Sequence, residues 1–237
     1  MKSAISIKNL TISYDEKKIL SNININIPKG KLIGIIGPNG GGKSTFIKGI
    51  LDIVKNSSGD IKFQGEYYKE YLKKIAYIPQ RDTVDWDFPT TVLDVVIMGS
   101  YGRLGLFKRP KKKEKEMAIL MLKKVGMEKY LNRQISQLSG GEKQRVFIAR
   151  ALMQKAEIYF MDEPFQGVDI KTEKAIIKIL KTLKEKNKTV LVVHHNLETV
   201  KEYFDYLVMI NRKIIAKGEI ADVFNKENIK KTFYRDY

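Results

Sequence analysis

A glycine-rich stretch between an apolar run and a helix-like segment constrains the fold of this chain more than any other feature. Residues 37–45 read GPNGGGKST and match the pattern G-x-x-x-x-G-K-[ST], directly after Leu32–Ile36 and at the start of the segment 44–54. In the order strand, loop and helix, this pattern is typical of a phosphate-binding loop, or P-loop, whose backbone N–H groups surround an anion. The helix N-terminus adds a favourable dipole. Lys43 can then reach the outer phosphates, and Ser44 can place its hydroxyl on Mg²⁺.

Composition excludes several classes of protein. With 237 residues and 43% hydrophobic content, the chain can bury the core of one large α/β domain. No window approaches the roughly 18 consecutive apolar residues of a membrane span, and residues 1–6 do not resemble a signal peptide. We therefore expect the chain to stay in the cytoplasm. Zero Cys and two His argue against disulfides and against thiolate or imidazole metal sites, so we expect any catalytic metal to be Mg²⁺ on oxygen ligands.

The formal charge of +17 raises the question of a nucleic-acid partner. The Lys residues are spread over the whole length, however, and no basic motif is interleaved with aromatic residues. Dispersed charge of this kind marks solvated faces and attracts any anion, including ATP and anionic lipid. We expect no nucleic-acid partner.

Strand-like patterns surround the P-loop on both sides. Apolar and polar residues alternate in residues 3–14 and 22–27, a period of two typical of antiparallel strands covered on one face. Leu32–Ile36 is apolar throughout, which predicts a buried central strand. Further strands are expected at residues 59–65, 75–78, 158–161 and 189–193, and a hairpin at 206–216.

Residues 90–154 change to a helical period. One apolar face consists of Val92, Val95, Val96 and Met98. A second covers residues 117–125 and ends before Gly126, a candidate C-cap. We expect the basic stretch 103–113 between them to be an exposed loop.

Two further helices are expected at residues 171–186 and 219–234. Together the patterns predict an α/β fold: a P-loop NTPase core with a mixed sheet, an N-terminal antiparallel β subdomain and an inserted α-helical subdomain. We expect one domain over residues 1–237, with the helical insert at about 90–154.

The apolar strand at 158–161 ends in two carboxylates. Asp162 can hold the shell of Mg²⁺, and Glu163 can polarise a water for attack on the terminal phosphate. An apolar run followed by Asp-Glu is common by itself. Pro164, which breaks the strand at this point, favours the functional interpretation.

The segment 138–145, LSGGEKQR, predicts a second anion site. Ser139 and Glu142 form the capping box S-x-x-E at a helix start, where Gly140 and Gly141 leave the backbone bare. An ordinary capped helix is the alternative. Two phosphate sites in one chain favour a shared nucleotide instead.

These segments together resemble the ATP-binding cassette ATPases, the motor subunits of ABC transporters, over essentially the whole chain. The resemblance implies ATP and Mg²⁺ as cofactors. The implied nucleotide-binding residues are Tyr14, Gly37, Pro38, Asn39, Gly40, Gly41, Gly42, Lys43, Ser44 and Thr45. The implied signature, which binds the ATP of the opposite subunit, is Ser139, Gly140, Gly141 and Glu142. The implied Mg²⁺ shell is Ser44, Gln80 and Asp162, with Glu163 and His195 catalytic and Asp169 in the D-loop.

Two of these assignments compete with simpler interpretations. By resemblance Tyr14 stacks on adenine, although alone it would more often be plain strand. His194 and His195 both follow the strand at 189–193, and a single His near a strand end is more often structural. His195 is chosen because it precedes the position of the usual Asp, here Asn196.

Some motifs indicate a subgroup of this family. Residues 165–169 (FQGVD), 84–92 (VDWDFPTTV) and 102–105 (GRLG) look like the ATPases of bacterial manganese and zinc importers. Trp86, the sole Trp, is either a core residue or, between Asp85 and Asp87, a surface feature that faces a partner.

The resemblance implies an ATP-hydrolysing subunit, peripheral at the cytoplasmic face of the membrane, that drives divalent metal import. Manganese is the first choice of cargo, and zinc or an iron chelate is the alternative. A separate integral membrane permease is required, contacted through residues 80–109. An extracytoplasmic metal-binding protein belongs to the complex without touching this chain.

A second copy of the chain is also expected. The signature lies about 100 residues after the P-loop, across a helical insert, so it should close on the ATP of another copy in a homodimer. The rivals are a soluble cassette ATPase acting on ribosomes or DNA, which usually has two cassettes or a coiled-coil insert, and a P-loop kinase, which needs no signature.

Overall fold

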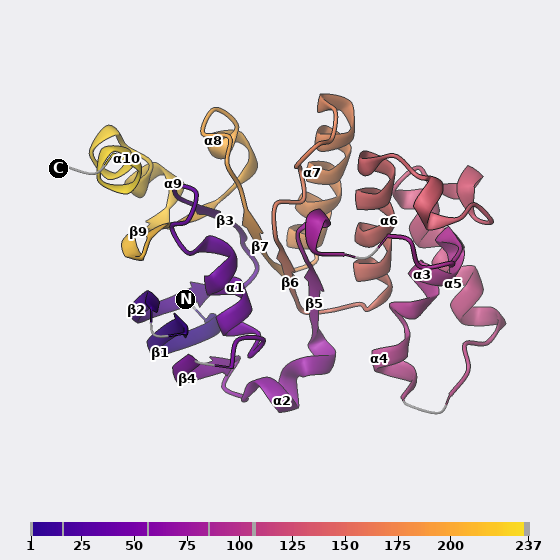
Figure 1. Cartoon of the computed structure of the whole chain (residues 1–237), viewed down its shortest axis with the longest axis horizontal. Helices are drawn as coiled ribbons and strands as arrows, with labels where there is room; N and C mark the ends of the chain where they lie inside the picture. The colour runs from indigo at the N-terminus through magenta and orange to yellow at the C-terminus, as the bar shows by residue number, and fades with distance from the viewer. Residues whose placement is uncertain (1, 16, 56, 85, 106–107, 235–237) are drawn as a thin grey trace. The chain divides into compact units, whose positions relative to one another are not determined.

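The computed structural model describes residues 2–15, 17–55, 57–84, 86–105 and 108–234. The chain forms two compact units: unit 1 is Met1–Leu72 with Leu183–Tyr237, and unit 2 is Lys73–Thr182. Figure 1 labels the elements of both. No helix in these described ranges is long and apolar enough to cross a membrane. Asp85 and residues 106–107, parts of the expected permease contact, lie outside the described residues.

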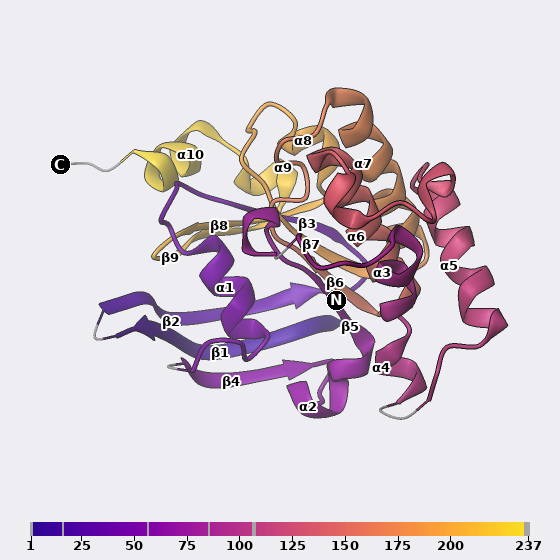
Figure 2. The same cartoon turned by 45° about the vertical axis from the view of Figure 1, so that its right-hand side comes forward.

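The N-terminal part of unit 1 is the expected antiparallel sheet. Its strands are β1 (Ser3–Tyr14), β2 (Lys17–Pro28) and β4 (Ser57–Phe63), in the order β2-β1-β4. Ile5 lies opposite Ile27 of β2 and Phe63 of β4, so the alternating apolar residues share one face. Helix α1 (Lys43–Ile50) lies along this sheet (Figure 2) and buries Phe46 and Ile47.

Four strands form the other sheet region of unit 1, in the order β7-β3-β8-β9. The central strand β3 (Leu32–Ile36) pairs in parallel with β7 (Thr189–Val193) and β8 (Tyr206–Asn211). Strand β9 (Lys213–Glu219) returns antiparallel to β8, which confirms the expected hairpin. All residues of β3 and β7 are buried, as their apolar runs predict. The P-loop therefore starts from a buried strand with a neighbour on each side.

The C-terminal segment differs from the prediction of one helix. Instead it holds two, α9 (Ile220–Val223) and α10 (Lys226–Phe233). The break lies at Asn225, whose side chain accepts a hydrogen bond from Asn228 N at 2.9 Å and caps α10. A local side-chain cap thus overrides the longer helical pattern.

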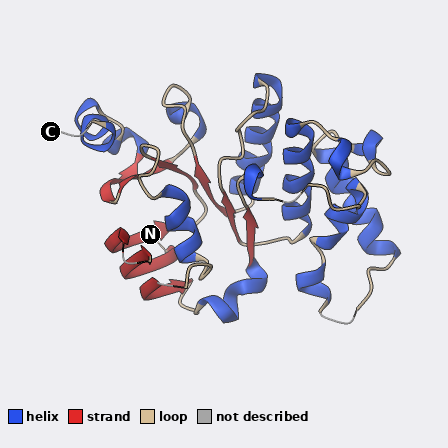
Figure 3. Ribbon diagram, viewed as in Figure 1, coloured by secondary structure: helices blue, strands red, loops and turns tan. Residues whose placement is uncertain are grey.

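Unit 2 combines two parallel strands with a group of helices. Strand β5 (Ile75–Ile78) pairs with β6 (Ile158–Met161). Helices α3 (Val92–Met98), α5 (Lys112–Lys124) and α6 (Gly140–Met153) pack on one another, and Figure 3 shows the described residues from α3 to α6 as helices joined by loops. The C-cap of α5 is Val125, one residue before the expected Gly126, and Gly126 follows it in a left-handed conformation with a φ of 69°.

The basic stretch 103–113 is not entirely loop. Its start belongs to the short helix α4 (Tyr101–Leu104), and its end to α5. Helix α7 (Ile170–Glu185) leads from unit 2 back to unit 1 along the chain. The remaining short elements are α2 (Tyr68–Tyr71), η1 (Leu72–Lys74), η2 (Arg81–Thr83), η3 (Glu128–Tyr130), η4 (Ile135–Gln137) and α8 (Val200–Tyr203).

Candidate functional site

The P-loop of unit 1 has the backbone geometry that an anion site requires. Gly42 caps α1 with a φ of 96°, a left-handed conformation that costs glycine nothing. A Cβ on Gly37 would collide with the carbonyl oxygen of Ile210 on β8, so the loop can pass this strand only with glycine there. The loop carbonyl of Gly41 also accepts a hydrogen bond from Arg212 N at 2.8 Å, which fixes the loop to the β8–β9 hairpin.

The side chain of Lys43 stabilises this loop through hydrogen bonds to the loop's own carbonyl oxygens. Its side chain is 5% exposed, and its Nζ donates to the carbonyl oxygens of Gly37 at 3.0 Å and Pro38 at 2.9 Å. The ammonium is thus held beside the N-terminus of α1, where backbone dipole and charge both favour an anion. Ser44 and Thr45 follow on the first turn of this helix, half-buried. These residues fit a bound phosphate chain.

The two histidines after β7 have different surroundings. His194 is 4% exposed, its Nε2 lies 2.7 Å from Thr199 Oγ1, and its ring packs edge-on against Phe204 at 5.3 Å. Burial lowers the pKa of His194 to about 4, so its ring is neutral at physiological pH. His195 is exposed. The buried ring of His194 thus has a packing role, and His195 remains the candidate for phosphate contact.

Tyr14 lies at the end of β1 and is 43% exposed, opposite Lys17 in the register. A ring that far out of the core can accept a stacked base. Its role as the adenine contact stays a prediction.

The carboxylates of unit 2 lie where β6 ends. Asp162 is 1% exposed, and its backbone N–H donates to the carbonyl oxygen of Ile78 at 2.9 Å. Glu163 adopts a left-handed backbone with a φ of 53°. For a residue other than glycine this conformation costs on the order of 1 kcal/mol, and such strain is concentrated at functional sites.

Gln80 joins Glu163 at this site. Its Nε2 donates to Glu163 Oε2 at 3.3 Å and to Gln166 Oε1 at 3.3 Å. The structure therefore brings together two residues, 83 positions apart, that the sequence assigned to the Mg²⁺ shell and to water activation. The hydrogen bond limits the rotation of the Glu163 carboxylate.

The expected capping box is present at the signature. Ser139 Oγ accepts from Glu142 N at 3.4 Å, and Glu142 Oε2 accepts from Ser139 N at 2.8 Å. The hydrogen bond from the Ser139 backbone is the main reason why the pKa of Glu142 is lowered. Ser139 is exposed, and Gly140 and Gly141 are half-buried. The start of α6 is thus an accessible helix N-terminus.

Asp169 has a structural task as well as its expected D-loop position. Its carboxylate accepts from Thr172 N at 2.9 Å and from Thr172 Oγ1 at 2.7 Å, at the start of α7. These two hydrogen bonds lower the pKa of Asp169. The residue is therefore ionised and fixed in place.

Two residues of this region were not assigned to the site from the sequence. The guanidinium of Arg81 lies against Gly140, where a Cβ would collide with its Nη1. Trp86 is half-buried, with its ring 4.8 Å from that of Phe147 and its Nε1 donating to Arg81 O at 2.9 Å. The only signal in the sequence is that Arg81 directly follows Gln80.

Three residues are expected from the sequence to hold Mg²⁺. The ranges that the structure describes contain no group of three or more His, Cys, Asp or Glu able to hold a metal ion. The expected ligands are the hydroxyl of Ser44, the amide oxygen of Gln80 and the carboxylate of Asp162. Oxygen ligands of this kind suit Mg²⁺ that is also bound by nucleotide phosphates.

Comparisons with known proteins agree with this geometry. Residues 20–166 match the family model described as ABC transporter. The chain is 58% identical to the manganese transport system ATP-binding protein MntB of Bacillus subtilis, over 97% of this chain and 92% of the relative. It is 50% identical to the zinc transport system ATP-binding protein TroB of Treponema pallidum, over 97% and 86%.

Solved structures show the same likeness. An ATP-binding cassette of an ABC transporter in its ADP conformation has a TM-score of 0.78 at 30% identity, over 97% of this chain and 98% of that one. An ATP-binding subunit of an ABC transporter has a TM-score of 0.81 at 25% identity, over 93% and 92%. The P-loop, the carboxylates after β6 and the capped signature helix thus belong to a cassette ATPase, and the chain is a member of the ABC transporter family.

Proposed function

We propose that this chain hydrolyses ATP to energise the uptake of a divalent metal, Mn²⁺ first, through a separate membrane permease. The assignment of Mn²⁺ as cargo rests on the 58% identity to a manganese transport system ATP-binding protein over 97% of this chain. The chain would lie at the cytoplasmic face of the membrane. An extracytoplasmic metal-binding protein would deliver the ion to the permease without touching this chain.

In the proposed mechanism, the P-loop holds the phosphates of ATP through its backbone N–H groups and Lys43. Ser44, Gln80 and Asp162 are the residues that would hold Mg²⁺, which neutralises charge on the phosphates when bound. Glu163 orients and polarises the attacking water, while Gln80 keeps the carboxylate in place. We assign Tyr14 to the adenine and His195 to the terminal phosphate.

The signature is proposed to complete the site of a second copy. The accessible N-terminus of α6, with Ser139, Gly140 and Gly141, suits a terminal phosphate, which would belong to the ATP of the opposite subunit. Two copies would then enclose two ATP molecules, and hydrolysis would release them. Asp169 would lie near the boundary between the two copies.

A test of the dimer uses Glu163→Gln, which keeps the shape of the side chain but loses the charge that activates water. With Mg-ATP this variant should accumulate as a dimer in light scattering. Adding Ser139→Arg should abolish the dimer, because a long cation blocks the phosphate cap. A variant that stays monomeric at saturating ATP, or a dimer indifferent to Ser139→Arg, would refute the proposal.

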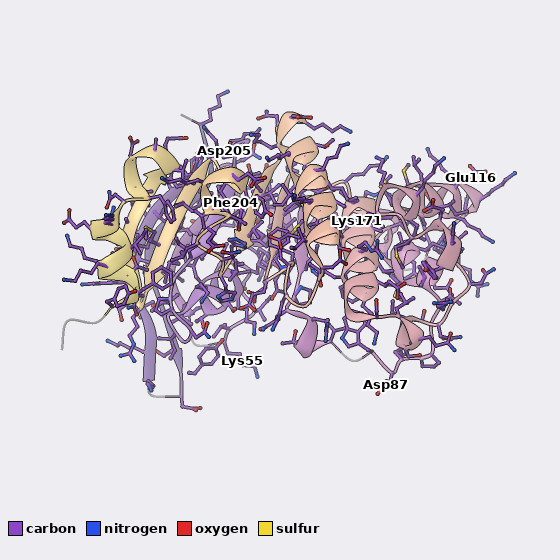
Figure 4. All side chains as sticks on the ribbon, turned by 90° about the horizontal axis from the view of Figure 1, so that it is seen from above. Lys55, Asp87, Glu116, Lys171, Phe204 and Asp205 are labelled. Carbon is purple, nitrogen blue, oxygen red and sulfur yellow. The ribbon has the colours of Figure 1, made fainter. Side chains whose placement is uncertain are left out.

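The permease contact is proposed at residues 80–109 of unit 2. Phe88 is 58% exposed, and Asp87, labelled in Figure 4, is exposed beside it. A hollow of about 780 Å³ is lined by residues that include Tyr101, Lys108 and Arg109. Aromatic residues and Arg are enriched at surfaces that bind another protein, and Phe88, Tyr101 and Arg109 are of these types.

Zinc remains the second candidate cargo, because a zinc transport system ATP-binding protein is 50% identical over 97% of the chain. An iron chelate is the third alternative. In this proposal the ion passes through the permease, and the permease selects it. The test is uptake by vesicles that contain the chain, its permease and its binding protein. ATP-dependent uptake of Mn²⁺ above that of Zn²⁺ is expected, and uptake of zinc or an iron chelate alone would reassign the cargo.

A further inference from the structure

Two neighbouring residues of unit 2 touch two different parts of the proposed ATPase site. Gln80 Nε2 donates to Glu163 Oε2 at 3.3 Å. Arg81, the next residue, reaches the start of α6, where a Cβ on Gly140 would collide with its Nη1 and lie 2.9 Å from its Cζ. In the proposed dimer, Glu163 serves the ATP of its own subunit and Gly140 caps the ATP of the other. The pair Gln80-Arg81 therefore links both sites within one chain.

The Arg81 guanidinium also approaches residues 165–169, the loop that contains the expected D-loop residue Asp169. A Cβ on Gly167 would lie 3.2 Å from Arg81 Nη1. Gly167 directly follows Gln166, whose Oε1 accepts the second hydrogen bond from Gln80, at 3.3 Å. Residues 80 and 81 thus contact the same loop at two adjacent positions.

The main chain of Arg81 is linked to α6 through Trp86, and α6 is also the helix that its guanidinium contacts. Its carbonyl oxygen accepts from Trp86 Nε1 at 2.9 Å. The Trp86 ring packs on Phe147 with centroids 4.8 Å apart, and Lys143 Nζ lies 5.2 Å from the ring centroid. Phe147 and Lys143 both belong to α6. A displacement of α6 is therefore transmitted to Arg81 at its backbone and at its guanidinium.

Because Arg81 is positively charged, a phosphate bound at the N-terminus of α6 changes the free energy of its guanidinium there. A cation at a helix N-terminus interacts unfavourably with the backbone dipole, whereas an anion there interacts favourably with both the dipole and the cation. A phosphate at Ser139 and Gly141 thus lowers the free energy of Arg81 in this position. The arrival of ATP at the signature acts directly on Arg81.

We infer that Arg81 is a positioning residue that couples the two ATP sites of the dimer. Phosphate bound by the signature of one subunit fixes Arg81, and through Gln80 it fixes the Glu163 carboxylate that acts on that subunit's own ATP. The inference rests on the proposed function, because it requires the signature to bind the partner's ATP. Its consequence is cooperative hydrolysis.

The first experiment measures the ATPase rate of the full chain as a function of ATP concentration. The wild type should show a Hill coefficient above 1, and Arg81→Ala should reduce it to about 1. We expect kcat to fall roughly three- to tenfold while the KM for ATP changes less than about twofold, because the P-loop is intact. Arg133→Ala is the matched control, since its guanidinium stacks on Tyr130 at 4.6 Å and is exposed. A Hill coefficient that Arg81→Ala leaves unchanged would overturn the inference.

The second experiment uses the two signature glycines. Gly140→Ala introduces the Cβ that must displace the Arg81 guanidinium, so the double variant with Arg81→Ala should be no slower than the slower single variant. At Gly141 a Cβ would instead meet Val168 Cγ1 at 3.6 Å, an ordinary contact. The effect of Gly141→Ala should therefore multiply with that of Arg81→Ala. Multiplicative effects for both pairs would contradict the inference.

The dimerisation of Glu163→Gln separates this inference from the proposed function. If the dimer forms with ATP and Arg81→Ala keeps the wild-type Hill coefficient, the coupling is wrong, and the proposed dimer that encloses two ATP molecules stands. If no dimer forms, the proposed dimer and the coupling are both wrong.

Discussion

Asp205 fixes the strand that leads to the P-loop, and its replacement tests how much that support contributes to stability. Its Oδ2 accepts from Leu32 N at 3.0 Å at the start of β3, and its Oδ1 accepts from Lys184 Nζ at 2.9 Å. Figure 4 labels Asp205 beside Phe204, and the ring of Phe204 packs against Gly34 of β3. Leu32 is 0% exposed, so water cannot replace the lost acceptor.

The magnitude follows from these two contacts. Asp205→Ala leaves a buried N–H without its acceptor, at a cost of about 1–3 kcal/mol. The ion pair has side chains 32% and 28% exposed, so its loss adds only about 0.5 kcal/mol. We expect Asp205→Ala to lower the free energy of unfolding by about 1.5–3.5 kcal/mol. Asp205→Asn keeps an acceptor for Leu32 N and should cost about 1 kcal/mol or less.

Urea denaturation followed by far-ultraviolet circular dichroism measures both variants, because the sole Trp, Trp86, lies in unit 2 and reports on that unit. The slope of the free energy of unfolding against urea concentration should be the same in both variants as in the wild type. Equal losses in the Ala and Asn variants would refute the reasoning, since they would show that the charge and not the acceptor for Leu32 supports β3.

Three further predictions concern the site and its surroundings. Lys43→Ala removes the cation that braces the P-loop and should weaken ATP binding and reduce turnover by roughly 100-fold or more; wild-type activity in this variant would exclude the P-loop assignment. The pKa of His194 is lowered to about 4 in the folded state, so the unfolded chain binds this proton at higher pH, and folding stability should fall as pH drops from about 6.5 toward 4. His194→Gln should flatten that part of the stability profile by up to about 3 kcal/mol, and an unchanged profile would show that other groups cause it. Asp87→Lys should lower metal uptake in the assembled complex while basal ATPase activity stays near wild type, and unchanged uptake would place the permease contact elsewhere.

Local spacing explains what could be predicted from the sequence. The P-loop and the capping box of Ser139 and Glu142 depend on residues three to eight positions apart, and the alternation in β1 and β2 depends on neighbours two apart. Each pattern carries its own physical cause within a short window. The buried runs of β3 and β7 were recognisable for the same reason.

Contacts between distant positions could not be predicted in this way. Arg81 lies against Gly140 although α3, α4 and α5 separate them along the chain, and no pattern around either residue indicates the contact. The left-handed backbone of Glu163 follows from the path of the chain after β6 and not from the residue type. The expected single C-terminal helix was wrong because the side chain of Asn225 caps a second helix, α10, within the segment.

The burial of Lys43 has a consequence for the affinity of the site. Lys43 as a residue is only 5% exposed, so its ammonium group loses hydration on folding, and the carbonyl oxygens of Gly37 and Pro38 compensate part of that loss. This desolvation takes place when the chain folds and not when the ligand arrives. A phosphate that enters the loop meets a cation already stripped of water and fixed in orientation, so the free energy of binding is not reduced by dehydrating the lysine or by ordering its four-carbon chain. The P-loop is preorganised by its own lysine.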